Sequence, residues 1–297
     1  MRSSFSALPV VLAGALLLAG CGSQAAGPGS RGGALSPEPL PGASSCGVVP
    51  SGGSAGPEKD GVKITAVRGA CAEFEVTNRE AGPLSYSISL TFMAASGGAS
   101  VTAEEAVLSV GSGQTVKRTV VGPLALGSVP AGVRIVKVRS VPSAEASAET
   151  GPCPPSGVRV YADQGNAAMG LRAVGLHLEN CGTGTTRLNG YPQLQILDEE
   201  HKVVESVQVL QGGSAIATGT GADGPPEPLA LQPGERAQAI VVWRNTLEAG
   251  VADPVNAPYL RVRAQAGSDP VMVIPELDLG TTGRLGVGAW QREDRKG

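Results

Sequence analysis

Two short segments of the chain carry residue types that bind metals or transfer protons. His177 and Glu179 fall on one face of an expected strand, and the run Asp198-Glu199-Glu200-His201 forms a small acidic cluster. Imidazole and carboxylate groups are common ligands of transition metals, so a metal carrier or an enzyme that uses residues near His177 and His201 is conceivable. The chain has only two histidines and no H-E-x-x-H pattern, which excludes a site with three imidazole ligands. A solvated strand face and a charged hairpin turn explain the same residues, and we expect no bound metal or cofactor.

Two glycine-rich strings match catalytic patterns but lack the elements that those patterns need. Gly52-Gly53-Ser54-Ala55-Gly56 matches the G-x-S-x-G string of hydrolases, whose serine must lie between a strand and a helix. Gly219-Thr220-Gly221-Ala222-Asp223-Gly224 matches a dinucleotide-binding string, but prolines follow where a helix should begin. The paired carboxylates Glu104-Glu105 would point to opposite faces of a strand, and we expect a solvated turn there. The sequence therefore predicts no catalytic residues, and we expect that the protein is not an enzyme.

The first 21 residues have the parts of a secretory signal. Arg2 precedes an apolar stretch from Ala7 to Gly20, which is too short to cross a bilayer as a stable helix. The four residues Leu18-Ala19-Gly20-Cys21 resemble the lipobox of bacterial lipoproteins. The resemblance implies cleavage after Gly20 and a diacylglyceryl group on the Cys21 sulfur. Two acyl chains anchor a protein stably, so we expect the lipid bilayer as a partner and the extracytoplasmic face of the cell membrane as the location.

Four of the five cysteines remain once Cys21 is assigned to the lipid, and an extracytoplasmic location permits disulfides between them. Cys46 and Cys71 precede residue 141, whereas Cys153 and Cys181 follow residue 152. Separately folded halves favour the pairs Cys46–Cys71 and Cys153–Cys181 among the three possible connectivities. A metal site is the competing interpretation, but the chain has no C-x-x-C spacing.

Charge and aromatic content argue against nucleic acid as a partner. The formal net charge is −3 and the isoelectric point is about 5.6, so no basic surface would gather phosphates. Aromatic residues make up only 3% of the chain, which leaves few rings to stack on bases or sugars. Hydrophobic residues make up 41% and charged residues 16%, which predicts a globular protein rather than a disordered one.

Composition divides the chain into six segments. Residues 22–45 are mostly Gly, Ala, Ser and Pro, and a second low-complexity run covers residues 141–152. Such segments cannot bury enough apolar surface to fold, so they predict a disordered tether and a linker between separately folded halves. We expect a signal peptide at 1–20, a lipidated tether at 21–45, an N-terminal β-sandwich at 46–140, the linker at 141–152, a C-terminal β-sandwich at 153–290 and a charged tail at 291–297.

Short alternating segments predict an all-β fold. Apolar and polar residues alternate without a break from Leu84 to Phe92, and Ala72, Phe74 and Val76 alternate with polar neighbours in the same way. Turn residues separate further strand candidates, and no amphipathic helix of three turns is evident. These candidates are 62–67, 107–110, 115–121, 133–141, 158–162, 174–178, 194–197, 203–210, 237–243, 259–264, 271–274 and 285–289. Two immunoglobulin-like sandwiches in tandem are the expected architecture.

Several separated motifs in the second half resemble one bacterial family. They are Ala168-Met169-Gly170-Leu171-Arg172, Leu178-Glu179-Asn180-Cys181-Gly182, Leu188-Asn189-Gly190-Tyr191-Pro192, Leu197-Asp198, Leu231 to Ala237, Trp243-Arg244-Asn245-Thr246 and Leu277 to Gly283. In this order they look like the family labelled domain of unknown function 4232. The resemblance implies an exported, lipid-anchored protein with no established activity. The first half shows no such fingerprint.

The anchor, the tether and the lack of a catalytic pattern favour a non-catalytic binding or scaffold protein of the cell envelope. Its loops or sheet edges would bind an unknown envelope protein or a cell-wall component, and nucleic acid would not be a partner. An envelope enzyme or metal carrier that uses residues near His177 and His201 is the alternative. A spacer that holds one domain beyond the other is a third possibility.

Overall fold

The structure is a computed structural model that describes residues 56–68, 71–94, 100–122, 130–248, 250 and 252–293. The expected signal peptide, the lipidation site Cys21, the tether and Cys46 all lie outside these ranges. The described residues are mostly strand, and the predicted all-β class is confirmed. Within the described ranges no helix is long and apolar enough to span a membrane.

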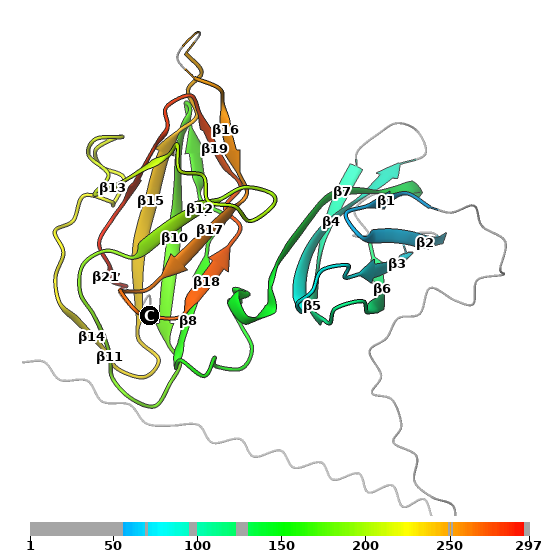
Figure 1. Cartoon of the computed structure of the whole chain (residues 1–297), viewed down its shortest axis with the longest axis horizontal. Helices are drawn as coiled ribbons and strands as arrows, with labels where there is room; N and C mark the ends of the chain where they lie inside the picture. Colours follow the sequence, from blue (N-terminus) through cyan, green and yellow to red (C-terminus); the bar gives the residue numbers. More distant parts are fainter. Residues whose placement is uncertain are drawn as a thin grey trace, which may run out of the picture. The chain divides into compact units, whose positions relative to one another are not determined.

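The first half of the described chain, which we call the first sandwich, consists of two antiparallel sheets (Figure 1). One sheet has the strand order β1-β2-β3-β6 and the other the order β5-β4-β7. The strands are β1 (Glu58–Lys59), β2 (Val62–Arg68), β3 (Cys71–Thr77), β4 (Leu84–Ala94), β5 (Ser100–Val110), β6 (Thr115–Val121) and β7 (Pro130–Pro142).

The core of the first sandwich lies between these sheets, as the alternation predicts. Phe74 and Val76 of β3 are buried, together with Ile88, Leu90 and Phe92 of β4. On the outer face of β4, several hydroxyl residues are also buried. Hydrogen bonds to side chains of β5 account for this, since Ser89 donates to Glu104 at 2.7 Å and the hydroxyls of Thr91 and Thr102 lie 2.9 Å apart.

The second half, which we call the second sandwich, has one large sheet faced by smaller ones (Figure 1). The large sheet has the order β13-β20-β15-β10-β8, with β21 added to β15 and β9 added to β10. The smaller sheets have the orders β12-β17-β18, β11-β14 and β16-β19. The strands are β8 (Val158–Ala162), β9 (Asn166–Ala168), β10 (Leu171–Asn180), β11 (Thr186–Leu188), β12 (Gln193–Leu197), β13 (Gln208–Gln211), β14 (Leu229–Leu231), β15 (Arg236–Arg244), β16 (Val255–Ala257), β17 (Tyr259–Arg263), β18 (Pro270–Val273), β19 (Leu277–Gly280), β20 (Arg284–Val287) and β21 (Gln291–Arg292).

A second apolar core fills the space between these sheets. It contains Leu176 and Leu178 of β10, Leu260 of β17 and both tryptophans of the chain, Trp243 and Trp290. The Trp290 indole donates to the Ala264 carbonyl at 2.8 Å, so its one polar atom is satisfied within the core. This core is separate from that of the first sandwich.

The two sandwiches share one detailed feature, a buried asparagine corner. Asn78 follows β3 and Asn180 ends β10, and both side chains are almost fully buried. The Asn78 amide donates to the carbonyls of Gly82 and Val110 at 2.8 Å each. Its carbonyl oxygen accepts the N–H of Glu80 at 2.8 Å. Every polar atom of this side chain therefore has a backbone partner.

Asn180 makes the same bonds in the second sandwich. Its amide donates to the carbonyls of Gly184 at 2.7 Å and Leu231 at 2.8 Å, and its oxygen accepts the N–H of Gly182 at 3.2 Å. In each sandwich the same asparagine also bonds through its backbone to a tight turn, which is formed by Gly113-Gln114 in the first and Gly234-Glu235 in the second. Pro233 and Gly234 thus belong to a tight turn of the second sandwich, and the first half carries a counterpart that its sequence did not reveal.

Two predictions of local structure are wrong. Residues 203–210 were expected to form one strand, but only Gln208–Gln211 does so, as β13, and Val203 forms an isolated bridge with Leu197. Glu104 and Glu105 lie within the long strand β5 and not in a solvated turn. Burial raises the pKa of the Glu105 carboxyl, and the positive charge of Arg118 opposes this shift.

Two segments expected to lie outside the sandwiches make contacts within them. Val141 and Pro142 of the expected linker are the last residues of β7, and a short 3-10 helix, η2 (Ser143–Glu145), follows. At the other end of the chain, Gln291 and Arg292 of the expected tail form β21, which pairs with β15. Tertiary contacts therefore order short polar segments whose composition alone indicates coil.

Candidate functional site

His177 lies on β10 between two carboxylates. Its Nδ1 atom contacts Glu293, and its Nε2 atom lies 3.2 Å from an Asp163 carboxylate oxygen. The Tyr161 ring stacks on the imidazole at a centroid distance of 5.0 Å. The imidazole thus links Glu293, which follows β21, to Asp163, which follows β8. Its neighbour Glu179 pairs instead with Arg159 at 3.2 Å and Arg236 at 3.3 Å.

The segment Asp198–His201 forms the expected hairpin turn. An Asp198 carboxylate oxygen accepts the N–H groups of Glu200 at 3.0 Å and Lys202 at 2.8 Å. The turn directs the imidazole of His201 away from this cluster, and its Nε2 atom lies 2.8 Å from the Ser140 carbonyl oxygen. Within the described residues no group of three or more His, Cys, Asp or Glu side chains could hold a metal ion.

Residues 139–147, which we call the strap, connect the two sandwiches and pack on the second. Arg139 at the start of the strap forms a bidentate pair with Glu276, with both hydrogen bonds at 2.9 Å. Burial raises the pKa of the Glu276 carboxyl, but hydrogen bonding and positive charge from Arg139 outweigh burial and hold this pKa below its ordinary value. Glu276 is therefore ionised at neutral pH, and the pair is a charge-assisted contact.

The middle of the strap is held by a tyrosine and a histidine of the second sandwich. The Ser140 N–H donates to the Tyr259 hydroxyl oxygen at 3.1 Å, while the Ser140 carbonyl faces His201 as described above. Burial raises the pKa of the Tyr259 hydroxyl, so this group is neutral at physiological pH. Val141 packs in a small apolar cluster with Tyr259, Leu197 and Met272.

The end of the strap closes the open side of the second sandwich. β18 is an edge strand of one sheet and β8 is an edge strand of the other. Ala146 forms a parallel bridge with Met272 of β18, and the Ser147 hydroxyl donates to the Val160 carbonyl of β8 at 3.1 Å. Glu145 pairs with Arg261 of β17 at 2.6 Å. The strap thus covers part of two strand edges that would otherwise face solvent.

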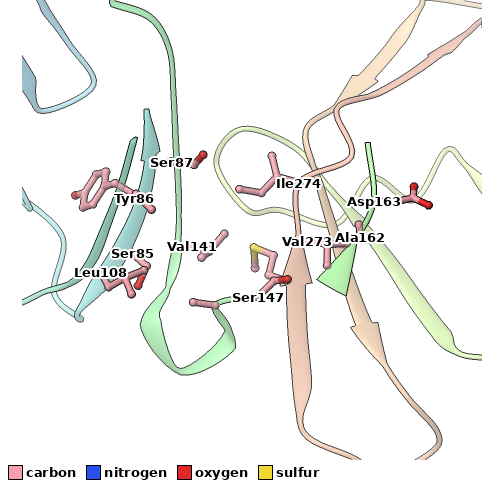
Figure 2. Close-up of a pocket in the computed structure, with 13 residues that line it drawn as sticks. Ser85, Tyr86, Ser87, Leu108, Val141, Ser147, Ala162, Asp163, Val273 and Ile274 are labelled. Atoms are coloured by element: carbon pink, nitrogen blue, oxygen red, sulfur yellow. The ribbon is translucent and has the colours of Figure 1, made fainter. Parts of the chain in front are cut away.

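A groove of about 300 Å³ continues from the strap along these edges. Figure 2 shows residues of the first sandwich on one side of the groove and the ends of β18 and β8 on the other. Its lining is mostly apolar, with a few hydroxyls and one carboxylate, and comprises Ser85, Tyr86, Ser87, Ala106, Leu108, Val141, Ala146, Ser147, Ala162, Asp163, Met272, Val273 and Ile274.

Leu108 is the most exposed apolar residue of this lining, with 65% of its surface accessible. It lies in β5 where the register against β4 shifts, and the next residue, Ser109, has a φ of 53°. A bulge of this kind redirects a side chain from the strand's regular face, and a positive φ at a residue other than glycine costs about 1 kcal/mol or more. Neighbouring contacts sustain this conformation, since the Ser109 N–H donates to the Ser85 hydroxyl at 3.2 Å.

A polar cluster around Asp278 lies beside a smaller cavity of about 230 Å³. The Asp278 carboxylate accepts hydrogen bonds from the Trp243 indole at 2.8 Å, from Asn245 at 2.6 Å and from Arg172 at 2.9 Å. Three of the separated sequence motifs therefore meet at one carboxylate. Because its donors come from β10 and from the end of β15, the cluster joins the large sheet to β19.

The predicted Cys153–Cys181 disulfide is present, with a Cα–Cα distance of 5.6 Å. It ties the segment before β8 to the residue after Asn180. Cys71, at the start of β3, is also disulfide-bonded. Its predicted partner Cys46 lies outside the described residues, so the Cys46–Cys71 pair stays a prediction.

The second sandwich matches a known family over nearly its whole length. Residues 153–291 match the family described as Domain of unknown function (DUF4232). The C-terminal half of the chain belongs to this family. The DUF4232 domain therefore includes the disulfide, the Asn180 corner and the Asp278 cluster, and the predicted resemblance is confirmed. The chain has no match among curated proteins.

The strap and the groove were not found by the sequence analysis. The groove takes residues from the first sandwich, from the strap and from the DUF4232 domain, and these segments lie far apart in the sequence. One signal was available within the expected linker. Val141 and Ala146 are apolar and both contact the second sandwich. The Ser, Glu and Pro residues around them are typical of a linker, so the two apolar residues alone did not predict this contact.

Proposed function

We propose that the protein is a lipid-anchored lipoprotein on the extracytoplasmic face of the cell membrane, and that it acts there as a non-catalytic binding or scaffold module. The lipobox-like sequence at Cys21 supports the anchor. The observation that carries the binding role is the groove, because it joins both sandwiches and the strap in one concave, mostly apolar surface.

The positions of the two histidines favour this proposal over the enzyme or metal carrier. His177 contacts a carboxylate at each ring nitrogen, and His201 contacts the strap backbone. Both imidazoles therefore take part in contacts that join separate segments of the fold. Asp278 is likewise occupied by donors from three side chains.

Replacing Cys21 by Ser tests the anchor. We expect Cys21→Ser to abolish labelling by a radioactive fatty acid and to move the protein from the membrane fraction to the soluble one. A Ser45→Cys, Cys21→Ser double variant is the matched control, because it restores a cysteine outside the lipobox and should remain unlabelled. An unchanged membrane fraction for Cys21→Ser would refute the anchor.

Cross-linking in intact cells, followed by mass spectrometry, tests the binding role without a guess about the ligand. We expect cross-links from residues of the groove lining to one envelope protein or to cell-wall material. Cross-links distributed evenly over the surface would contradict a dedicated binding module.

A further inference from the structure

The side chain of His177 is enclosed on the outer face of the large sheet of the second sandwich. In the strand ladders His177 is paired with Tyr161 of β8 and with Gln238 of β15. The Tyr161 ring stacks on the imidazole with an interplanar angle of 13°, and the Gln238 amide nitrogen lies 3.5 Å from the imidazole Nε2 atom. Only 16% of the His177 side chain is accessible. These contacts fix the orientation of the ring, so each nitrogen faces a defined partner.

Both of these partners are carboxylate oxygens. The Nδ1 atom of His177 contacts Glu293, and the Nε2 atom lies 3.2 Å from Asp163. A neutral imidazole carries one N–H donor and one lone pair, whereas the protonated ring donates at both nitrogens. In the neutral ring, one carboxylate would therefore face a lone pair, and the two acceptors would repel each other. The geometry fits the protonated ring.

The two carboxylates differ in how firmly they are held. The second oxygen of Asp163 accepts the N–H groups of Gly165 at 2.8 Å and Gly175 at 2.9 Å. Among the described residues, the Glu293 carboxylate has no hydrogen-bond or ion-pair partner besides His177. Loss of the ring proton should therefore release Glu293 and leave Asp163 in place.

The other charged groups near the ring also favour a positive charge on it. Glu179 pairs with Arg159 and Arg236, and the negative charge of Glu149 acts on the stacked Tyr161. Together with the two carboxylates at the ring nitrogens, this gives four negative charges against two positive ones. Burial raises the pKa of the Tyr161 hydroxyl, so this group is neutral at physiological pH.

Glu293 follows β21 and helps to hold it in place. The two residues of β21 pair with Ala237 and Gln238 of β15, and the Glu293 N–H donates to the Arg236 carbonyl at 3.1 Å. Trp290, just before β21, is anchored in the core, and the Arg292 side chain adds an ion pair at the surface. The segment after Trp290 is therefore held by a short ladder, by surface contacts and by one contact that depends on a proton.

We propose that His177 is a proton-binding site that fastens the C-terminal segment, residues 291–293, to β15. The contact is closed when the ring is protonated and Glu293 is ionised. As the pH rises and the ring loses one proton, the contribution of this contact is lost, which is opposite in sign to the loss of a carboxylate contact in acid. This inference goes beyond the proposed binding role and does not depend on it.

The test uses the mature chain, residues 21–297, carrying Cys21→Ser. NMR spectra of the imidazole nitrogens show how many protons the His177 ring carries, and amide hydrogen exchange, corrected for intrinsic rates, shows how firmly Glu293 is held. Measurements are made at about pH 5.5 and about pH 8.5, on either side of the ordinary imidazole value of about 6.5. We expect two ring protons and a protected Glu293 amide at the lower pH. At the higher pH we expect one ring proton and about tenfold lower protection, because a charge-assisted hydrogen bond is lost.

Glu293→Gln and His177→Gln should each abolish the pH dependence of this protection, because neither variant can form the charged contact. His201→Gln is the matched control, since it keeps His177 and its partners, and it should show the same tenfold change as the parent. Tryptophan fluorescence should confirm that all variants are folded. Equal protection of the Glu293 amide at both pH values in the parent would overturn the proposal. So would a change that persists in Glu293→Gln or that is lost in His201→Gln, since another group would then control the segment.

Discussion

Asn78 in the first sandwich and Asn180 in the second make the same hydrogen bonds, although the residues around them differ. The first corner combines Asn78-Arg79-Glu80 with the turn Val110 to Gln114, and the second combines Asn180-Cys181-Gly182 with the turn Leu231 to Glu235. In both, the asparagine ends a central strand and bonds to the turn before the strand that pairs with it. The same buried amide corner therefore forms in both sandwiches from different surrounding residues.

The two sandwiches differ in what surrounds the corner. In the second, Cys181 follows the asparagine directly and is bonded to Cys153, so a covalent link lies beside the amide. In the first, Arg79 holds the equivalent position and pairs with Glu58 at the surface. Hydrogen bonds alone are therefore sufficient to form the corner, and the disulfide adds stability to one copy of it.

The largest expected effect concerns that disulfide. The double variant Cys153→Ser, Cys181→Ser should lower the free energy of unfolding of the second sandwich by about 3–4 kcal/mol, because the bond closes a loop with a sequence separation of 28 residues. Urea unfolding followed by tryptophan fluorescence measures this sandwich alone, since both tryptophans lie in it. Hydrogen exchange at β4 reports on the first sandwich and should not change. An equal loss of unfolding free energy in both sandwiches would contradict the conclusion that this disulfide stabilises the second sandwich only.

The asparagine corners should give the next effect, and it should be equal in the two copies. Asn78→Ala and Asn180→Ala each leave two backbone carbonyls without a donor, which should cost about 2–3 kcal/mol in the sandwich that carries the change. Hydrogen exchange of β3 and β10 amides measures each separately. Asn166→Ala, at an exposed position of β9, is the control and should be neutral. A large effect at one asparagine and none at the other would refute the equivalence of the corners.

The turn glycines give a smaller test of the same equivalence. Gly113 and Gly234 have φ values of 68° and 81°, and a Cβ atom at either would meet no atom within 4 Å. Gly113→Ala and Gly234→Ala should therefore cost about 1 kcal/mol each from backbone conformation alone. Gly82→Ala and Gly184→Ala are matched controls without a positive φ or a close neighbour, and they should be neutral or slightly stabilising. Unfolding midpoints of the four variants provide the comparison.

The strap contact should give the smallest effect, and it should depend on pH. The pKa of Glu276 is lowered in the folded protein, so its contribution is complete above the ordinary value of 4.5 and is lost as the pH falls through the folded value. Hydrogen exchange at Ser140, corrected for the intrinsic pH dependence, should accelerate in acid in the parent but not in Glu276→Gln. Glu248→Gln, at an exposed carboxyl, should behave as the parent does. Equal acid sensitivity in Glu276→Gln would show that another group controls the contact.

The sequence predicted the strands that have a strong pattern of their own. The alternation in Leu84–Phe92 identified β4, and the motifs after Val158 identified the family of the second half. β5 was found only at its end, because Ser100 to Glu105 alternates weakly and carries paired glutamates. The prediction of one strand at 203–210 was wrong for the opposite reason. This segment has apolar residues in a strand-like pattern, but it pairs with other strands only through β13 and one isolated bridge.

The candidate site could not be predicted because no local pattern encodes it. Val141 and Ala146 have partners more than 100 residues further along the chain, at Tyr259 and Met272. The equivalence of Asn78 and Asn180 was hidden in the same way. Each asparagine donates to backbone carbonyls, which residues of any type can supply, so the residues around the two corners share no sequence pattern. The disulfide was predictable because cysteine pairing follows from count and position.

The asparagine corners also bear on the order in which the two halves fold. Each corner closes a loop, which spans 32 residues from Asn78 to Val110 and 51 residues from Asn180 to Leu231. The entropy of loop closure makes the longer one more costly by about 0.4 kcal/mol, or about twofold in the rate of encounter. The Cys153–Cys181 bond does not shorten that loop, because it closes a different one. By loop closure alone, the corner of the first sandwich should therefore form about twofold faster than the corner of the second.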